Sequence, residues 1–148
     1  RGSGALRYWD TSALVPLIVA EPTSARSRAL ARGDAHIATW WGTYVECAAA
    51  LARRQRQRQL TDAGHADAQT ALQRTARTWT IVEPGPALRE AAAQRAIVHG
   101  LTSGDALQLA AGLAWADGHP HGRHFVTLDR ALAEAARREG FTVLPAEA

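Results

Sequence analysis

The segment that decides the fold is Ala5-Leu-Arg-Tyr-Trp-Asp-Thr-Ser-Ala-Leu14, in which a short apolar run ends on an aspartate. We expect Leu6–Trp9 to form a buried strand and Ala13–Ala20 to form a helix, with Pro16 in its first turn. Asp10 then lies at the carboxyl end of the strand. Ligands of open α/β sheets bind at that edge, so Asp10 is the first candidate for a functional residue.

The alternation of short apolar runs with helical segments continues along the chain. Further strands are expected over 36–41, 80–83, 124–128 and 141–144, and further helices over 23–32, 43–59, 62–78, 87–99, 103–117 and 130–139. Ser103 is the expected N-cap of the helix over 103–117, and Thr61 or Asp62 is that of the helix over 62–78. The pattern predicts the α/β class, as an α/β/α sandwich around a central, mainly parallel sheet of about four to five short strands.

The domain organisation follows from the same pattern. Neither an internal repeat nor a linker interrupts residues 5–148, which we interpret as one domain. Residues 1–4, Arg-Gly-Ser-Gly, lack an initiator Met and are interpreted as a vector-derived tail. No apolar stretch approaches the roughly 18 residues of a membrane span. The lone cysteine, Cys47, excludes an internal disulfide and predicts a reducing, cytoplasmic location without a membrane partner.

Three further acids accompany Asp10. Glu46 lies in an uncharged stretch, Asp105 falls in the first turn of a helix, and Asp129 ends the apolar run that starts at Phe125. Each has a structural alternative: Asp10 and Asp129 could be helix caps, Glu46 could face solvent, and a helix dipole favours Asp105. Capping does not predict all four together. Carboxylates in apolar surroundings are costly unless a cation gathers them, which points to a divalent ion and phosphodiester chemistry.

The charge balance indicates a polyanionic partner. The chain has 17 basic residues, all of them arginine, against 14 acids, for a net charge of +3. If four acids surround a cation, the remaining surface carries a net charge of about +7. Genome base composition could explain why the basic residues are arginine and not lysine, but it does not explain the excess of positive charge.

Several other phosphate-handling classes are excluded. No glycine-rich dinucleotide fingerprint follows Trp9, and a P-loop or a response-regulator receiver requires a lysine that the chain lacks. A haloacid-dehalogenase-type phosphatase needs an aspartate where Ser12 stands. No Cys or His spacing matches a zinc site, and the histidines at 119, 121 and 124 are interpreted as a polar loop interrupted by Pro and Gly.

The four acid motifs together resemble those of a PIN-domain ribonuclease of the VapC toxin type. They are Asp10-Thr-Ser-Ala-Leu-Val, Glu46-Cys with Ala50-Leu-Ala-Arg53, Asp105-Ala-Leu-Gln-Leu-Ala, and Val126-Thr-Leu-Asp129 with Leu132 and Ala133. The resemblance covers essentially all of residues 5–148. It implies a PIN-like fold and a Mg²⁺- or Mn²⁺-dependent endoribonuclease that leaves a 5′-phosphate and a 3′-hydroxyl. It also implies an RNA substrate, a cognate antitoxin protein and a homodimer.

The resemblance also implies a role for each residue. Asp10 and Asp105 are the expected direct metal ligands, while Glu46 and Asp129 bind a second ion or act through water. The hydroxyl groups of Ser12 and Thr127 are expected to support these acids. We also expect the carboxylates to repel one another, by roughly 4 kcal/mol for a pair about 4 Å apart near the surface.

Two features remain open between function and structure. The run that contains Arg53, Arg54, Arg56 and Arg58 either contacts RNA or the antitoxin, or is a solvated helix end favoured by the helix dipole. The five tryptophans are expected mostly in the core or a dimer interface, with Trp40 and Trp41 pointing in different directions. Two other functions stay possible at this point: a PIN-type nuclease for RNA processing or single-stranded DNA without an antitoxin, or a non-catalytic nucleic-acid-binding module.

Overall fold

The computed structural model describes residues 7–34 and 36–146, so residues 1–4 lie outside its description. Short strands alternate with helices, as the sequence predicts. The strands are β1 (Arg7–Trp9), β2 (Ile37–Trp40), β3 (Thr80–Val82), β4 (His124–Val126) and β5 (Thr142–Leu144). The helices are α1 (Thr11–Ile18), α2 (Ser24–Arg32), α3 (Thr43–Arg56), α4 (Asp62–Ala76), α5 (Pro86–His99), α6 (Ser103–Trp115) and α7 (Arg130–Glu139).

The strands form one five-stranded sheet in the order β3-β2-β1-β4-β5, and every pairing is parallel. The prediction of a mainly parallel sheet of four to five strands is therefore confirmed. β1 lies at the centre, between β2 and β4, so the segments that follow these strands emerge side by side at one edge. That edge brings Asp10, after β1, close to Thr127, which follows β4.

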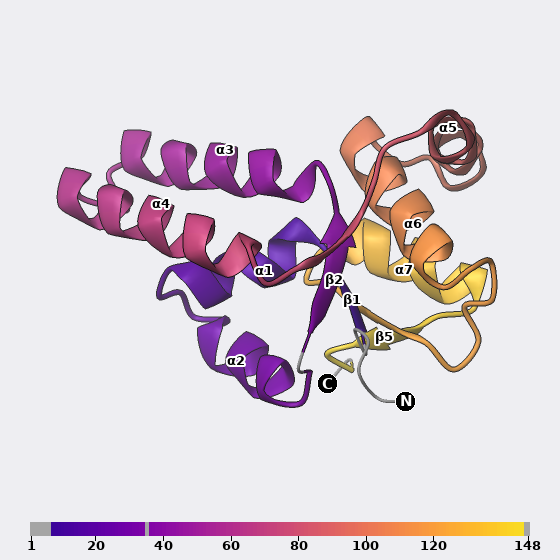
Figure 1. Cartoon of the computed structure of the whole chain (residues 1–148), viewed down its shortest axis with the longest axis horizontal. Coiled ribbons are helices and arrows are strands. Elements are labelled where there is room, and N and C mark those ends of the chain that lie inside the picture. Colours follow the sequence, from indigo (N-terminus) through magenta and orange to yellow (C-terminus); the bar gives the residue numbers. More distant parts are fainter. Residues whose placement is uncertain (1–6, 35, 147–148) are drawn as a thin grey trace.

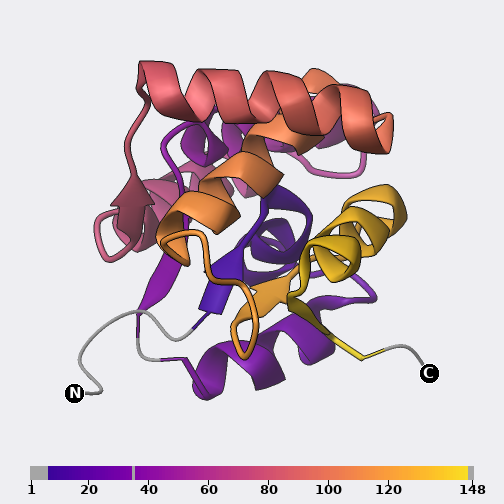
Figure 2. The ribbon, with the colours of Figure 1, turned by 90° about the vertical axis from the view of Figure 1, so that its right-hand side faces the viewer.

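Helices cover both faces of the sheet, which gives the predicted three layers (Figures 1 and 2). Neighbouring residues of a strand point to opposite faces: Tyr8 and Phe125 enter one core cluster, while Trp9 and Val126 enter the other. The first cluster contains buried side chains of α5, α6 and α7, and the second contains those of α1, α3 and α4. Within the described residues, no helix is long and apolar enough to cross a membrane.

Helix α1 begins two residues earlier than the sequence predicts. Its N-cap is Asp10, whose side chain accepts a hydrogen bond from the backbone N–H of Ala13. Because the helix starts at Thr11, Pro16 lies in its second turn and not in the first. The carboxylate that ends the central strand therefore also begins the next helix.

The other helix boundaries agree with the predicted caps in most places. Thr61 caps α4 by accepting a hydrogen bond from Gly64, as expected. The prediction for α6 was wrong by one residue: Thr102 accepts the hydrogen bond from the N–H of Asp105, and Ser103 is the first helical residue. Either hydroxyl suits an N-cap, and only the backbone direction of the preceding loop selects Thr102.

Gly112 allows α6 to pack closely on the sheet. A Cβ atom at this position would lie 2.6 Å from Cε2 of Phe125 and 3.5 Å from Cδ1 of Tyr8. Such a short distance requires the Phe125 ring to move, and that ring is fully buried. Gly112 therefore fixes how near the acid-bearing helix α6 lies to the strands.

We expect Gly112→Ala to lower the free energy of unfolding by about 1–2 kcal/mol. Overpacking a core costs about 1–3 kcal/mol, and alanine recovers part of that loss through its higher helix propensity. Denaturant unfolding would measure the difference. The control is Gly33→Ala, where a Cβ makes only ordinary contacts of 3.6 Å or more, φ is −92° and little change is expected. Equal stability of the two variants would contradict the packing role.

Candidate active site: an acidic cluster at the carboxyl edge of the sheet

Asp10 is the most buried of the four acids, with 3% of its surface exposed. Its Oδ1 atom accepts hydrogen bonds from the Ser12 hydroxyl at 2.7 Å and from the Ala13 N–H at 3.3 Å. Asp10 is therefore the N-cap of α1, and the Ser12 hydroxyl donates a hydrogen bond to it. The Thr127 hydroxyl and the Ser12 N–H also form hydrogen bonds with this carboxylate.

Ser12 and Thr127 join the ends of β1 and β4. The two hydroxyl oxygens lie 3.2 Å apart, and Ser12 Oγ accepts a hydrogen bond from the Leu128 N–H at 2.8 Å. Thr127 Oγ1 accepts another from the Asp129 N–H at 3.0 Å. The two predicted supporting residues therefore connect Asp10 with the backbone that carries Asp129.

Glu46 reaches the same edge from the first turn of α3. Its Oε1 atom accepts hydrogen bonds from the hydroxyl of Thr11 and, at 2.7 Å, from the side-chain amide of Gln108. Its Oε2 atom lies 3.2 Å from the position that a Cβ of Gly104 would take, so Glu46 packs against the start of α6. The alternative that Glu46 faces solvent is wrong.

Gln108 is the residue that sequence reasoning missed. Its Oε1 accepts a hydrogen bond from the Tyr8 hydroxyl at 2.6 Å, and its Nε2 lies within 3.0 Å of the Thr43 hydroxyl and within 3.3 Å of that of Thr11. One buried amide therefore ties β1, α1, α3 and α6 to Glu46. The available signal was a single polar residue in the otherwise apolar run from Ala106 to Gly112.

Asp105 and Asp129 begin the helices α6 and α7. Asp129 Oδ1 accepts a hydrogen bond from the Leu132 N–H at 2.9 Å, so the expected cap is present and uses only one carboxylate oxygen. The Asp105 carboxylate accepts no hydrogen bond from the described residues, although it is only partly exposed. A side chain of this kind is well placed to meet a ligand.

The electrostatics of the site are those of an uncompensated acidic pocket. Burial raises the pKa of the Asp10 carboxyl to about 7, against the hydrogen bonds from Ser12, Thr127 and the helix backbone, which lower it. For Asp105, burial first and then the charges of Asp129 and Glu46 raise the pKa to about 6. Within the described residues, none of the four acids forms an ion pair.

Repulsion between the carboxylates is expected from the sequence, but it is not what raises the pKa of Asp10. There the cause is burial away from water. Repulsion acts on Asp105, which the charges of Asp129 and Glu46 affect. The negative charges of Asp10 and Glu46 also help burial to raise the pKa of the Tyr8 hydroxyl and, to about 12, that of the Cys47 thiol.

The donor atoms of the pocket fit a hard divalent cation. They are carboxylate and hydroxyl oxygens, with no arginine paired to them within the described residues. In that same part of the chain, no three Asp, Glu, His or Cys side chains form a group that could hold an ion together. Mg²⁺ keeps several waters and is commonly bound through one or two carboxylates, so it does not require such a group.

Other features singled out in the sequence lie away from the acids. Arg56 ends α3 about 15 Å along the helix from Glu46, and Arg54 pairs with Glu21 at the end of α1. The histidines at 119, 121 and 124 lie in the loop and strand beyond α6, and form no group able to hold a metal within the described residues. Trp40 is buried whereas Trp41 is 55% exposed, which confirms that the adjacent pair diverges.

Comparison with known proteins identifies the family. Residues 7–138 match the family model of the PIN domain. The chain is 34% identical over 143 residues to ribonuclease VapC45 of Mycobacterium tuberculosis strain CDC 1551 / Oshkosh, and equally to ribonuclease VapC49 of strain ATCC 25618 / H37Rv. Each match spans 96% of this chain and 96% of the relative.

Solved structures share the fold. PAE2754 from Pyrobaculum aerophilum superposes with a TM-score of 0.63 at 25% identity, over 94% of this chain and 90% of that protein. Mycobacterium tuberculosis VapC20, described as a Sarcin-Ricin loop cleaving toxin, superposes with a TM-score of 0.66 at 18% identity, over 91% and 95%. A family match across almost the whole chain, together with relatives that align over nearly their full length, makes this protein a member of the PIN-domain family.

Proposed function

We propose that this protein is a Mg²⁺- or Mn²⁺-dependent endoribonuclease and the toxin of a toxin–antitoxin pair in the reducing cytoplasm. The observation that carries the proposal is the set of four acids at one edge of a parallel sheet, with Asp10 buried, Glu46, Asp105 and Asp129 half-buried, and none of them in an ion pair within the described residues. Full-length relatives that are named ribonucleases support RNA as the substrate, and their VapC names support an antitoxin protein as the partner.

Asp10 and Asp105 are the proposed direct ligands, since burial raises the pKa of both and the Asp105 carboxylate accepts no hydrogen bond from the described residues. Glu46 and Asp129 would hold a second ion or orient waters. A bound divalent ion would lower the pKa of a water and neutralise charge on the phosphoryl oxygens during in-line displacement.

The remaining residues act by holding these acids in place. Ser12 donates to Asp10, and its contact with Thr127 fixes the ends of two strands against each other. Gln108 and Thr11 both donate to the same oxygen of Glu46, which leaves Oε2 facing the start of α6. The expected products are a 5′-phosphate and a 3′-hydroxyl.

We expect Asp10→Asn to abolish Mn²⁺-dependent cleavage of total RNA while it raises the melting temperature in chelator. Asparagine keeps the acceptor for Ser12 and Ala13 but removes the buried charge. Because the folded-state pKa of about 7 lies above the ordinary 3.8, ionisation costs stability increasingly as pH rises from about 4 to 7. The gain from the substitution is therefore smallest near pH 4 and reaches up to about 4 kcal/mol above pH 7.

The test uses three arms: wild type with Mn²⁺, wild type with chelator, and Asp10→Asn with Mn²⁺. Fragments that require both the metal and Asp10 support the proposal. If antitoxin-free protein cuts no RNA but cuts single-stranded DNA, the RNA part of the proposal is wrong. If the protein binds no divalent ion near neutral pH, the alternative of a non-catalytic nucleic-acid-binding module is favoured. If it cleaves RNA but does not harm a host that expresses it alone, the alternative of an RNA-processing nuclease is favoured.

We expect Gln108→Leu to reduce kcat/KM for RNA cleavage by about 10–100-fold, because the hydrogen bond that orients Glu46 is lost. A double-mutant cycle with Glu46→Gln separates this role from a loss of folding. If Gln108 acts through Glu46, the two losses are not additive, and Gln108→Leu changes little in the Glu46→Gln background. Tyr8→Phe, which removes the hydroxyl that donates to Gln108 but keeps the bond from Gln108 to Glu46, is the matched control and should lose much less activity. Fully additive losses would contradict the positioning role.

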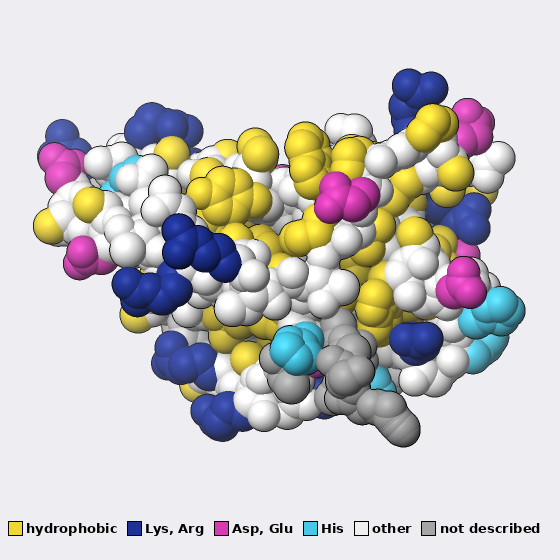
Figure 3. All heavy atoms as spheres, viewed as in Figure 1, with side chains coloured by type: hydrophobic (Ala, Val, Ile, Leu, Met, Phe, Trp, Pro, Cys, Tyr) yellow, Lys and Arg dark blue, Asp and Glu magenta, His cyan; other side chains and the backbone are white. Residues whose placement is uncertain are grey.

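We also propose a homodimer. The large hydrophobic side chains exposed on the described part of the chain fall at the start of α3 and the end of α5: Trp41, Tyr44, Val45, Ile97 and Val98. Figure 3 shows exposed hydrophobic atoms gathered between α3 and α5. Exposed apolar patches of this kind are typical of protein interfaces.

We expect light scattering after gel filtration to give about twice the chain mass of 15.9 kDa for wild type. Val45→Glu combined with Ile97→Glu should give the mass of one chain, because both charges would be buried in the interface. Gln73→Glu, on the exposed face of α4, is the control and should remain a dimer. A wild-type protein of single-chain mass at micromolar concentration would contradict the dimer.

A further inference from the structure

A groove of about 860 Å³ adjoins the acidic site on its α2 and α7 side. Thr127 and Asp129, which belong to the acidic site, form one end of it. The walls come from the first turn of α2 and from one face of α7 between Arg130 and Arg137, and the far end comes from β5 and the residues after it. The groove is thus continuous with the proposed site of cleavage.

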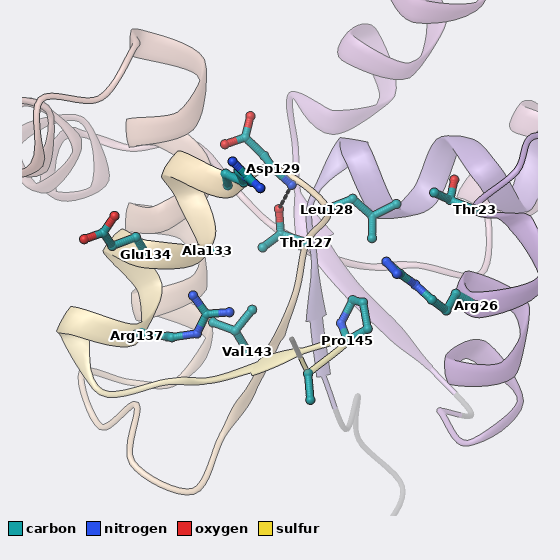
Figure 4. A pocket seen from close by; sticks show the side chains of 12 residues that line it. Thr23, Arg26, Thr127, Leu128, Asp129, Ala133, Glu134, Arg137, Val143 and Pro145 are labelled. Carbon is teal, nitrogen blue, oxygen red and sulfur yellow. Dashed lines mark hydrogen bonds between the residues drawn. The ribbon is translucent and has the colours of Figure 1, made fainter. Parts of the chain in front are cut away.

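Arginines dominate the charge of the groove. Arg26, Arg130 and Arg137 line it, against the acids Asp129 and Glu134. Glu134 is paired with Arg138 at 2.8 Å, which neutralises it. In the described part of the chain, Arg26 and Arg130 take part in no ion pair or side-chain hydrogen bond. Figure 4 shows Arg26 and Arg137 pointing into the groove from opposite walls.

The positions of Arg26 and Arg130 are unfavourable for helix stability. Arg130 is the first residue of α7 and Arg26 the third residue of α2, and neither helix has an acid in its first turn. The positive end of the helix dipole disfavours a cation there by a few tenths of a kcal/mol or more. The Asp129 carboxylate, the N-cap of α7, offsets this effect for Arg130, whereas the first turn of α2 holds no acid beside Arg26. An anion in the groove would favour both charges.

The rest of the lining suits a nucleotide. The hydroxyl of Thr23, the N-cap residue of α2, makes no capping hydrogen bond and lines the groove. The remaining surface is apolar and comes from Leu128, Ala133, Val143 and Pro145. Hydroxyl and guanidinium groups are usual donors to phosphate, and an apolar surface beside them can receive a base or a ribose.

We propose that this groove binds the RNA strand on one side of the cleaved bond, with Arg26 and Arg130 in contact with its phosphates. The inference rests on the proposed ribonuclease function, which it extends by assigning a substrate subsite. RNA is favoured over a protein partner because two unpaired cations and a free hydroxyl adjoin the acids where a phosphodiester must lie.

The test measures binding of a fluorescent, random-sequence RNA of about 12 nucleotides, since phosphate contacts do not depend on sequence. All variants carry Asp10→Asn so that the RNA stays intact. We expect Arg26→Gln with Arg130→Gln to raise Kd at low salt by at least ten-fold. The slope of log Kd against log salt should decrease by about 1–2, which corresponds to one or two lost phosphate contacts.

The matched control replaces two exposed arginines outside the groove, Arg28→Gln on α2 and Arg89→Gln on α5. It removes the same charge and should leave the salt slope unchanged. Thermal unfolding adds a second readout: the groove variant should melt at the same or a slightly higher temperature, because two unfavourable helix-dipole contacts are removed. An unchanged or higher melting temperature would show that weaker binding does not result from unfolding.

Cleavage by the protein with an intact Asp10 is measured in parallel. If that protein cleaves RNA but the groove variant has the Kd and slope of the control, the groove proposal alone is overturned, and the groove becomes a candidate surface for a protein partner. If the unsubstituted protein neither binds nor cleaves RNA, the proposed function and the groove proposal both fall.

Discussion

The structure depends on the stabilisation of carboxylates that have no arginine partner at the carboxyl edge of the sheet. All four acids stand at the beginning of a helix: Asp10 and Asp129 are N-caps, and Glu46 and Asp105 lie in first turns. Backbone N–H groups and the positive end of the helix dipole stabilise negative charge there. At Asp129 this arrangement leaves a carboxylate oxygen available, because the hydrogen bond from the helix end occupies only one of them. An arginine partner would have neutralised the pocket.

Glu46 is held differently. Its carboxylate accepts hydrogen bonds from side chains, the hydroxyl of Thr11 and the amide of Gln108, and not from the N–H groups of its own helix α3. That amide also accepts from Tyr8 in the central strand, so the orientation of Glu46 is fixed by the sheet on which the other acids stand. The close packing of α6 on Phe125, which Gly112 permits, sets the position of the amide. The packing of the core therefore determines the geometry of the site.

Charge outside the pocket has the opposite sign. The net charge of +3 includes two arginines in first turns of α2 and α7, where cations weaken a helix. Acids at some helix ends and arginines at others divide one edge of the sheet into a metal-attracting part and a phosphate-attracting part. A polyanion meets less repulsion at the acids when its neighbouring phosphates lie in the arginine-lined groove.

The sequence determined the order of strands and helices, the aspartates at their junctions and the glycines that end α2, α5 and α7. These are local properties, since turn chemistry and hydrophobic period act over a few residues. Local signals could not choose between Thr102 and Ser103, or between Asp10 and Ser12, as caps, because each member of a pair suits the role. They also gave no weight to Gln108, whose partners are up to 100 residues distant.

Only the tertiary structure decided which acids are buried, what raises each pKa, and which arginines adjoin the site. Burial of Asp10 depends on the pairing of β4 with β1 and on the contact of Thr127 with Ser12, which join segments more than 100 residues apart. The sequence left the run around Arg56 open between RNA, an antitoxin and solvent, and the length of α3 places Arg56 about 15 Å along the helix from Glu46. Arg26 and Arg130 carried no signal in the sequence, because their proximity arises only when parallel strands bring the following helices to one edge.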